Sequence, residues 1–250
     1  MKKIYKLPRK VKDEETGKDI TLNKLEKYNY YSGDLNLKVG KLKKDQIKDG
    51  LVSIQKDNYA VFDATLIDKI EAFKRRAQVI VAKDAGAIIA NTGINKESVI
   101  LEAGLGSGSL SAFLASIAKE VDTFDVNQDH IDVAKKNLDK LALKNININL
   151  QDITKVKLKK IYDVVILDLP NILEAVKNTK NHVKTGSFIV CYLPNINQVQ
   201  ELIVNLPEDV LVEKTLEIIE REWKITKNTS RPQTKDFSHT AFLVFLRKIY

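Results

Sequence analysis

The feature that most constrains the fold is a glycine-rich turn between an apolar strand and a helix. Residues 99–109 read Val-Ile-Leu-Glu-Ala-Gly-Leu-Gly-Ser-Gly-Ser, so Gly104, Gly106 and Gly108 follow a predicted strand at Val99–Glu102 and precede a predicted helix. Glycine permits a tight turn and a close approach of the backbone to a ligand. The spacing is one residue shorter than the dinucleotide fingerprint, which favours a nucleoside ligand without a pyrophosphate. A loop that only turns the chain is the alternative.

Strand and helix signals alternate around this turn, a pattern typical of a parallel sheet with crossover helices. A helix is expected where Ile131, Ala134, Leu138 and Leu141 recur at helical spacing, with Asp129 as its N-cap. The predicted strands are Val99–Glu102, Val121–Asp125, Ile146–Leu150, Asp163–Asp168 and Ser187–Tyr192.

The end of the chain departs from this alternation. Val210–Ile219 and Ala241–Leu246 are β-rich runs without a helix signal between them, and they predict an antiparallel pair at the edge of the sheet. The predicted fold class is therefore α/β, a Rossmann-like doubly wound sheet closed by a C-terminal antiparallel hairpin. That architecture resembles the class I methyltransferase fold.

The N-terminal part differs from the rest of the chain. Residues 1–68 carry a lysine-rich stretch at Lys38–Lys48 and short alternating runs such as Leu51–Ile54, which indicate a small β domain. Residues 69–250 form the second expected domain. The segment Asp68–Ile80 is interpreted as a linker that runs into it.

Charge and composition narrow the function classes. Lys and Arg outnumber Asp and Glu by 41 to 33, a net charge of +8 that suits a nucleic-acid partner or, alternatively, solvated lysine faces. We expect a cytoplasmic protein without membrane contact, since neither a secretory signal nor an apolar run of transmembrane length is evident. The lone Cys191 excludes an intramolecular disulfide, and three scattered histidines offer no metal-ligand spacing, so no metal is expected.

Acidic residues follow successive predicted strands. Asp125 is placed to accept hydrogen bonds from ribose hydroxyls, and Asp152 from the exocyclic amine of an adenine. Glu102 can face the cationic amino-acid end of the ligand, and His130 can line the adenine side. Each acid alone is better explained as a helix cap or a solvated turn residue, and His130 is explained equally well as a surface histidine at a helix end. Their joint position at the carboxyl ends of parallel strands favours a site.

Eight short motifs follow one another between about Phe73 and Arg247. They are Arg75-Arg-Ala-Gln-Val-Ile, Lys83-Asp-Ala-Gly, Glu102-Ala-Gly-Leu-Gly-Ser-Gly, Asp168-Leu-Pro, Tyr192-Leu-Pro-Asn-Ile-Asn-Gln-Val, Arg221-Glu-Trp, Arg231-Pro-Gln-Thr and His239-Thr-Ala-Phe-Leu-Val. In their order and spacing they resemble the tRNA (adenine-N1)-methyltransferases that modify position 58 in the T-loop, the TrmI type of bacteria and archaea.

The resemblance implies S-adenosylmethionine as cofactor, tRNA as partner, a homotetramer, and an N-terminal domain that helps bind tRNA. It places the acid that holds the ribose at Asp125, where the family more often has Glu, and the catalytic acid at Asp168. Asn171-Ile172 departs from the Gln-Pro that many archaeal members have after this motif. The residues that it places against the cofactor are Ser107, Gly108, Ser109 and Leu110.

The implied chemistry is methyl transfer to adenine N1. N1 has a free lone pair and needs no base, so alignment is the main task, and the Asp168 carboxylate would stabilise the cation that develops on the adenine. A helix cap is the alternative for Asp168. Tyr192 is expected to shape the base pocket, with core packing as its alternative. Further substrate contacts are expected from Arg231, Thr234 and His239, with His239 as structural support.

The predicted function is thus the transfer of a methyl group from S-adenosylmethionine to N1 of adenine 58 of tRNA, with position 57 left open. Lys38–Lys48 and Arg75–Arg76 are candidates for phosphate contact, and Tyr28, Tyr30 and Tyr31 for base stacking. A non-catalytic RNA-binding subunit of the same fold and a methyltransferase with a non-RNA substrate are the alternatives.

Overall fold

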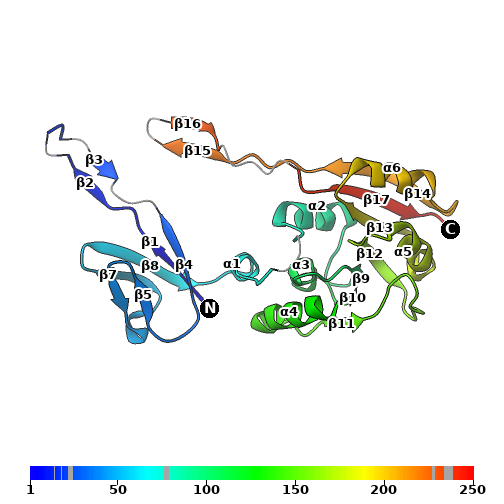
Figure 1. Cartoon of the computed structure of the whole chain (residues 1–250), viewed down its shortest axis with the longest axis horizontal. Coiled ribbons are helices and arrows are strands. Elements are labelled where there is room, and N and C mark those ends of the chain that lie inside the picture. Colours follow the sequence, from blue (N-terminus) through cyan, green and yellow to red (C-terminus); the bar gives the residue numbers. More distant parts are fainter. Residues whose placement is uncertain (14, 18, 22–24, 76–78, 227–228, 234–238) are drawn as a thin grey trace. The chain divides into compact units, whose positions relative to one another are not determined.

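The computed structural model describes residues 1–13, 15–17, 19–21, 25–75, 79–226, 229–233 and 239–250. The chain divides into two compact units, Met1–Phe73 and Lys74–Tyr250 (Figure 1). The expected boundary after residue 68 falls inside helix α1 (Leu66–Glu71). This helix begins where Thr65 and Asp68 cap one another, since each side chain accepts a hydrogen bond from the other's backbone N–H. The predicted linker is therefore helical in its first residues.

The N-terminal unit is a small β domain, as predicted. Its main sheet is antiparallel, with the strand order β4-β1-β8-β7. Ile4, Tyr59 and Val61 pack with Leu42 and Ile47 in its core. The strands of the main sheet are β1 (Lys2–Lys6), β4 (Glu26–Tyr30), β7 (Gly50–Ile54) and β8 (Asp57–Asp63). Besides α1, the described residues of this unit form two hairpins and a short 3-10 helix: β2 (Lys10–Lys12) with β3 (Asp19–Thr21), β5 (Leu35–Leu37) with β6 (Gly40–Leu42), and η1 (Lys44–Gln46).

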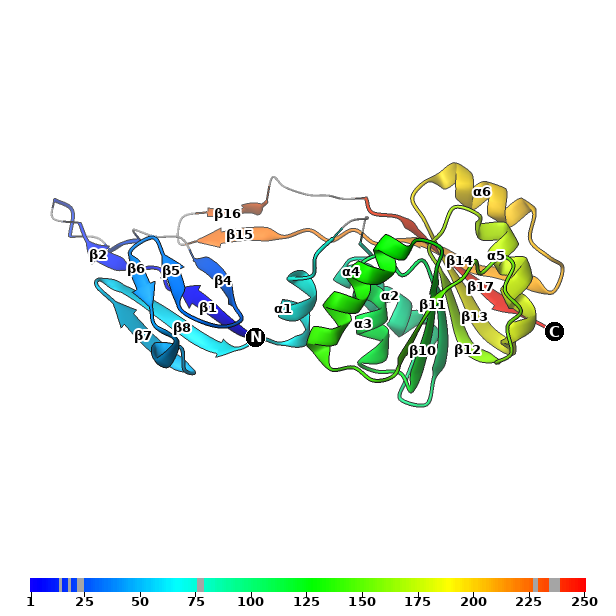
Figure 2. The same ribbon diagram turned by 60° about the horizontal axis from the view of Figure 1, so that its bottom comes forward.

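The second unit is built on a seven-stranded sheet with the order β11-β10-β9-β12-β13-β17-β14 (Figure 2). The first five strands in this order are parallel, whereas β17 is antiparallel to both of its neighbours. The predicted doubly wound sheet with an antiparallel pair at one edge is confirmed. The strands are β9 (Val99–Ala103), β10 (Glu120–Asp125), β11 (Ile146–Leu150), β12 (Tyr162–Leu167), β13 (Val183–Leu193), β14 (Val210–Glu217) and β17 (Phe242–Lys248).

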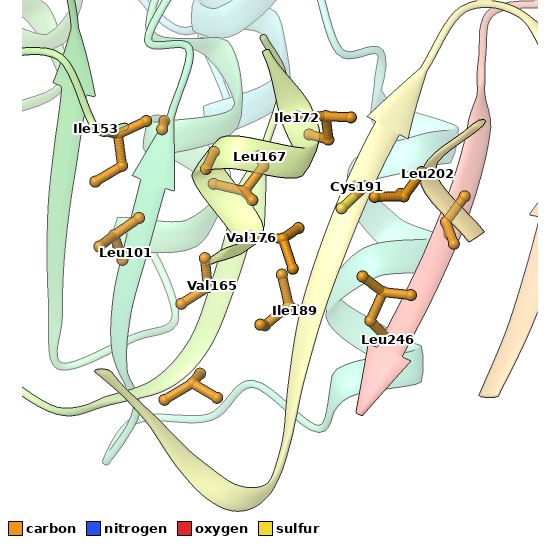
Figure 3. Packing of buried hydrophobic residues seen from close by; sticks show 14 of the residues in the cluster. Leu101, Ile153, Val165, Leu167, Ile172, Val176, Ile189, Cys191, Leu202 and Leu246 are labelled. Atoms are coloured by element: carbon orange, nitrogen blue, oxygen red, sulfur yellow. The ribbon is translucent and has the colours of Figure 1, made fainter. Parts of the chain in front are cut away.

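Helices cover both faces of this sheet because successive side chains of a buried strand point to opposite faces. On β12, Val165 and Leu167 pack with α5 and α6, whereas Val164 and Ile166 pack with α2 and α3. Figure 3 shows the first of these layers, in which Ile189 of β13 also takes part. Full burial of such a side chain contributes about 1.5–3 kcal/mol. The helices are α2 (Ala82–Thr92), α3 (Ser109–Ala115), α4 (Gln128–Leu138), α5 (Ile172–Thr179) and α6 (Ile196–Val204), with 3-10 turns η2 (Asp139–Leu141) and η3 (Lys180–His182).

Two local details differ from the predictions. Asp129 was expected to cap α4, but the cap is Asn127, whose side chain accepts the Asp129 N–H at 2.9 Å. Between β14 and β17 the chain forms a separate hairpin of β15 (Trp223–Thr226) and β16 (Thr229–Pro232), which no sequence signal indicated. Among the helices of the described residues, none is long and apolar enough to cross a membrane.

Candidate active site

The glycine turn occupies the carboxyl end of β9. Gly104, Gly106 and Gly108 all have positive φ angles, 98°, 51° and 80°. A β-carbon on Gly108 would lie 3.2 Å from the Leu138 side chain, so α4 packs directly against the start of α3. The turn therefore needs glycine both for its backbone conformation and for the close approach of its neighbours.

A cavity of about 540 Å³ opens beside this turn. Its walls come from the carboxyl ends of β9, β10, β11 and β12, the edge where ligands bind in open α/β sheets. It brings together six of the residues that the sequence predicted to bind the cofactor: Gly104, Gly106, Asp125, His130, Asp152 and Asp168.

A second, much smaller cavity of about 20 Å³ lies on the other side of the turn. Asp168, Gly104 and Gly106 line both cavities. The second cavity adds four more of the predicted cofactor-binding residues: Glu102, Ser107, Ser109 and Leu110. Of the predicted set, Gly108 alone lines neither of these two cavities; it serves as the N-cap of α3.

Glu102 is the most unusual charged group of this site. It is 1% exposed, and its Oε2 accepts a hydrogen bond from the Ser111 hydroxyl. Its Oε1 and the nearby Ser107 Oγ are buried without a hydrogen-bond partner among the described residues. Burial raises the pKa of Glu102 to about 8. Such unpartnered polar atoms are costly in a folded chain, so a ligand that pairs with them would gain affinity.

Asp125 fixes the turn on the side of the first cavity. Its Oδ2 accepts the Gly106 N–H at 3.2 Å and lies 3.2 Å from Nδ1 of His130, while its Oδ1 accepts the Asn127 N–H at 2.8 Å. The Asp125 carboxylate thus lines the first cavity and also holds the glycine turn through its hydrogen bond with Gly106. The shorter Asp, where the resembling family more often has Glu, fits these three contacts.

Asp168 follows β12 at the point where both cavities meet. Its N–H donates to the Ala103 carbonyl at 2.8 Å, which holds the two strand ends together. Burial, and then the charge of Asp125, raise the pKa of Asp168 to about 6. The carboxyl group is therefore mostly ionised at neutral pH yet poorly solvated, which suits the stabilisation of a nearby cation.

Asp152 lies farther along the first cavity. Its Oδ1 accepts hydrogen bonds from the hydroxyl of Thr154 at 2.6 Å and from its N–H at 2.9 Å, and its Oδ2 lies 3.2 Å from the Lys155 ammonium. The Thr154 hydrogen bonds lower the pKa of Asp152. Asp152 is thus an ionised acceptor in the cavity wall.

Three of the predicted substrate-binding residues, Tyr192, Arg231 and His239, line neither of these two cavities. Tyr192 is buried in the layer of α2 and α3, with its hydroxyl 3.0 Å from Asp84. Arg231 is an exposed residue of β16. His239 contacts the Glu217 carboxylate at 2.6 Å and the carbonyl of Pro194 at 2.9 Å, and the carbonyl, followed by the carboxylate, raises its pKa. Thr234 lies outside the described residues.

Some of the lysines and tyrosines of the N-terminal unit that were predicted to contact RNA already contact other residues of that unit. Lys41 forms an ion pair with Asp34 at 2.9 Å. Tyr28 and Tyr30 pack against the core of that unit, whereas Tyr31 is 55% exposed.

Two buried polar residues, Asp84 and Asn137, were not predicted from the sequence. Asp84 is fully buried and accepts hydrogen bonds from Lys83, Thr240 and Tyr192. The available sequence signal was the charged pair Lys83-Asp84 at the start of an otherwise apolar helix.

Asn137 is the second missed residue. It is fully buried on α4, donates to the carbonyls of Lys74 and Ser107 at 3.0 Å each, and accepts the Lys74 N–H at 3.1 Å. It joins the glycine turn to the segment that leads to Val79 and Ile80, which line the second cavity. An asparagine beside the apolar stripe of the helix was the only sequence signal.

The residues present fit S-adenosylmethionine, which joins an adenosine to a cationic amino-acid end. The larger cavity has the size and the acidic wall that a nucleoside requires. The smaller one is lined by Glu102 and Ser107, whose Oε1 and Oγ lack a hydrogen-bond partner among the described residues, and a carboxylate suits an ammonium group. Fold and site together define a class I S-adenosylmethionine-dependent methyltransferase.

The family model described as "tRNA methyltransferase complex GCD14 subunit" matches residues 70–240. The chain belongs to this family, and the resemblance inferred from its motifs is confirmed. It is similar to the tRNA (adenine(57)-N(1)/adenine(58)-N(1))-methyltransferase TrmI of Methanocaldococcus jannaschii, with 31% identity over an alignment of 268 residues covering 94% of this chain and 93% of the relative.

Two further proteins support this assignment. The tRNA (adenine(58)-N(1))-methyltransferase TrmI of Thermus thermophilus is 32% identical over 198 residues, 77% of this chain and 78% of the relative. The crystal structure of the tRNA (m1A58) methyltransferase TrmI from Aquifex aeolicus superposes with a TM-score of 0.79 at 28% identity, covering 100% of this chain and 97% of that one.

Proposed function

We propose that this protein transfers the methyl group of S-adenosylmethionine to N1 of adenine 58 in the T-loop of tRNA. The observation that carries the proposal is the position of Asp168, which lines both cavities around the glycine turn. The relatives of known activity support it, since each is a tRNA methyltransferase for this adenine. The Methanocaldococcus relative is named for position 57 as well, so an assay must read both positions.

Different acidic residues of the site would bind different parts of the cofactor. Glu102 and Ser107 would hold the amino-acid end of the cofactor, Asp125 its ribose and Asp152 the exocyclic amine of its adenine. Each of these residues lines a cavity, and the Glu102 Oε1 has no other partner among the described residues. The turn at Gly106 lets the backbone approach the bound nucleoside.

The catalytic task of the chain is alignment and charge stabilisation. When bound, S-adenosylmethionine supplies a methyl group on a sulfonium, and its transfer to N1 leaves the positive charge on the substrate adenine. Asp168 stabilises that charge by accepting a hydrogen bond from the N6 amine, because a partly buried carboxylate interacts more strongly with a cation than one in water. No side chain has to remove a proton, since N1 attacks with its free lone pair.

The remaining substrate contacts belong to the same proposal. Arg231 and Thr234 would contact tRNA phosphates, and Tyr192 and His239 would order the edge of the site. The packed position of Tyr192 and the two hydrogen bonds of His239 support an ordering role for both. The N-terminal unit, with its lysines, would help to hold the tRNA.

The same proposal includes a homotetrameric assembly and a cytoplasmic location. Light scattering on the purified protein measures the first. A monomeric mass would contradict a homotetramer without touching the proposed reaction.

One experiment tests the activity. Unmodified tRNA is incubated with isotopically labelled S-adenosylmethionine, and the methylated nucleotide is mapped by mass spectrometry of nuclease fragments. We expect one methyl group on N1 of a T-loop adenine. Label on another nucleotide would contradict the proposal, and cofactor binding without any transfer would favour a non-catalytic subunit.

A further inference from the structure

A third cavity lies between α5 and α6, next to the active site. Its volume is about 260 Å³, and Leu193 at the carboxyl end of β13 forms part of its wall. Pro170 and Asn171 line both this cavity and the first one, so the two hollows share a wall. The third cavity therefore opens at the same edge of the sheet as the cofactor site.

One residue that lines this cavity has a buried polar atom without a partner. Gln198, on α6, lines the cavity, and its Oε1 is buried without a hydrogen bond to any described residue. A buried acceptor in this state costs free energy that a donor from a ligand would recover. Asn171 stands at the N-terminus of α5 without capping it, so its amide is not engaged there.

The acidic residues at this cavity favour neutral or cationic ligands over anionic ones. Glu201 lines it together with Glu174, which is paired with Lys177 at 3.0 Å, and a carboxylate disfavours a phosphate inside the cavity. A neutral base with an amine that donates to Gln198 meets no such repulsion. The target adenine itself is excluded, because Asp168 lines the first two cavities and not the third.

We propose that this cavity holds the base of a nucleotide adjacent to the methylated adenine, an adenine whose exocyclic amine donates a hydrogen bond to Gln198 Oε1. The inference rests on the proposed tRNA substrate. Swinging the target adenine out of the T-loop breaks its stacking on its neighbours, and a pocket for one neighbour offsets part of that cost. Adjacent nucleotides are one backbone unit apart, which matches two cavities with a common wall. Gln198 is thereby a specificity residue for the tRNA sequence.

The test combines protein variants with modified tRNA. Two pairs of transcripts carry either adenine or unsubstituted purine, which lacks the amine, on the 5′ side or the 3′ side of the target. With the wild type, we expect kcat/KM for tRNA to fall about tenfold when the amine is lost at one of the two positions. For Gln198→Leu, kcat/KM should already be about tenfold lower with the adenine transcript, and it should not fall further with the purine transcript. Gln198→Glu, which keeps an acceptor, should remain sensitive to the amine.

Gln200→Leu is the matched control, because Gln200 is an exposed glutamine of the same helix that does not line the cavity. It should behave as the wild type, and cofactor affinity should be equal in all variants, which also shows that they fold. Equal rates on every transcript, or amine sensitivity retained in Gln198→Leu, would overturn the inference. A changed molecular mass of Gln198→Leu in light scattering would also overturn it, by assigning the cavity to a subunit contact. Failure of the proposed function is distinguishable, because the wild type would then methylate none of the adenine transcripts in the T-loop.

Discussion

A β-carbon on Gly104 would lie 2.0 Å from the carbonyl oxygen of Asp168. The glycine that starts the cofactor turn and the residue proposed for catalysis thus touch through their backbones. Gly104 also donates its N–H to the Phe124 carbonyl at 2.9 Å, so the turn is tied to β10 as well. Gly104 and Asp168 both line the two cavities, so this contact lies in their common wall.

We therefore expect Gly104→Ala to damage both stability and cofactor binding. The side chain would meet backbone rather than a flexible side chain, at a φ of 98°, so the free energy of unfolding should fall by more than about 3 kcal/mol. Denaturant unfolding and calorimetric titration measure the two effects. Gly86→Ala is the control: it lies within α2 in open space, and alanine there should stabilise by up to about 1 kcal/mol. Normal cofactor affinity in Gly104→Ala would refute the close-contact argument.

Asp168→Asn should lower the rate of methyl transfer by about 10²–10³ while cofactor affinity changes little, because the lost charge acts mainly on the developing cation. The pH dependence gives a second test. With a pKa raised to about 6, the active carboxylate forms as pH rises, so kcat/KM of the wild type for tRNA, measured at saturating S-adenosylmethionine, should increase with pH around 6 and level off above it. Asp168→Asn should lack this rise. Wild-type turnover in the variant would remove Asp168 from the mechanism.

Glu102 should couple cofactor binding to proton release. Its pKa of about 8 leaves it mostly protonated at pH 7 in the free chain, and a bound ammonium group favours the carboxylate and lowers that pKa. Affinity should thus rise as pH increases toward 8. Calorimetry in buffers of different ionisation enthalpy should show close to one proton more released by the wild type than by Glu102→Gln. Equal proton counts for the two proteins would mean that Glu102 does not face the ligand.

Asn137→Leu should lower the free energy of unfolding by about 2–4 kcal/mol, since it leaves the buried Ser107 carbonyl without this partner and removes two hydrogen bonds to the Lys74 backbone. Cofactor affinity should fall as well, because the glycine turn loses its tie to the segment before Val79. Asn145→Leu is the matched control: Asn145 also donates to two carbonyls, those of Ala115 and Ala118, but away from both cavities. It should lose stability and keep its affinity. Equal affinity in both variants would leave Asn137 with a purely structural role.

Much of the fold follows from patterns that are local in sequence. The alternation of apolar and polar residues in Ile146–Leu150 and the apolar run of Asp163–Asp168 predicted strands whose bounds the structure repeats or shifts by a few residues. The family, the fold class and the enzymatic activity were predicted correctly because the glycine turn and the motifs keep a fixed order and spacing. The roles of the individual site residues stay predictions.

Local misjudgements have identifiable causes. The N-cap of α4 is Asn127 and not Asp129, because Asn and Asp cap equally well and periodicity does not locate the first turn within two residues. In the hairpin of β15 and β16, the large side chains Trp223 and Ile225 are 53% and 74% exposed, so the buried apolar positions that mark a strand were missing there.

By itself, the sequence determined that acids stand at the ends of successive parallel strands and that glycine stands where the backbone must turn. Only the tertiary structure decided that Glu102 keeps one buried oxygen unpaired, that Asn137 joins Ser107 to Lys74, and that Gln198 lines the third cavity. The physical reason is that burial and pairing depend on segments distant in the chain, whereas turns and periodicity depend on neighbours.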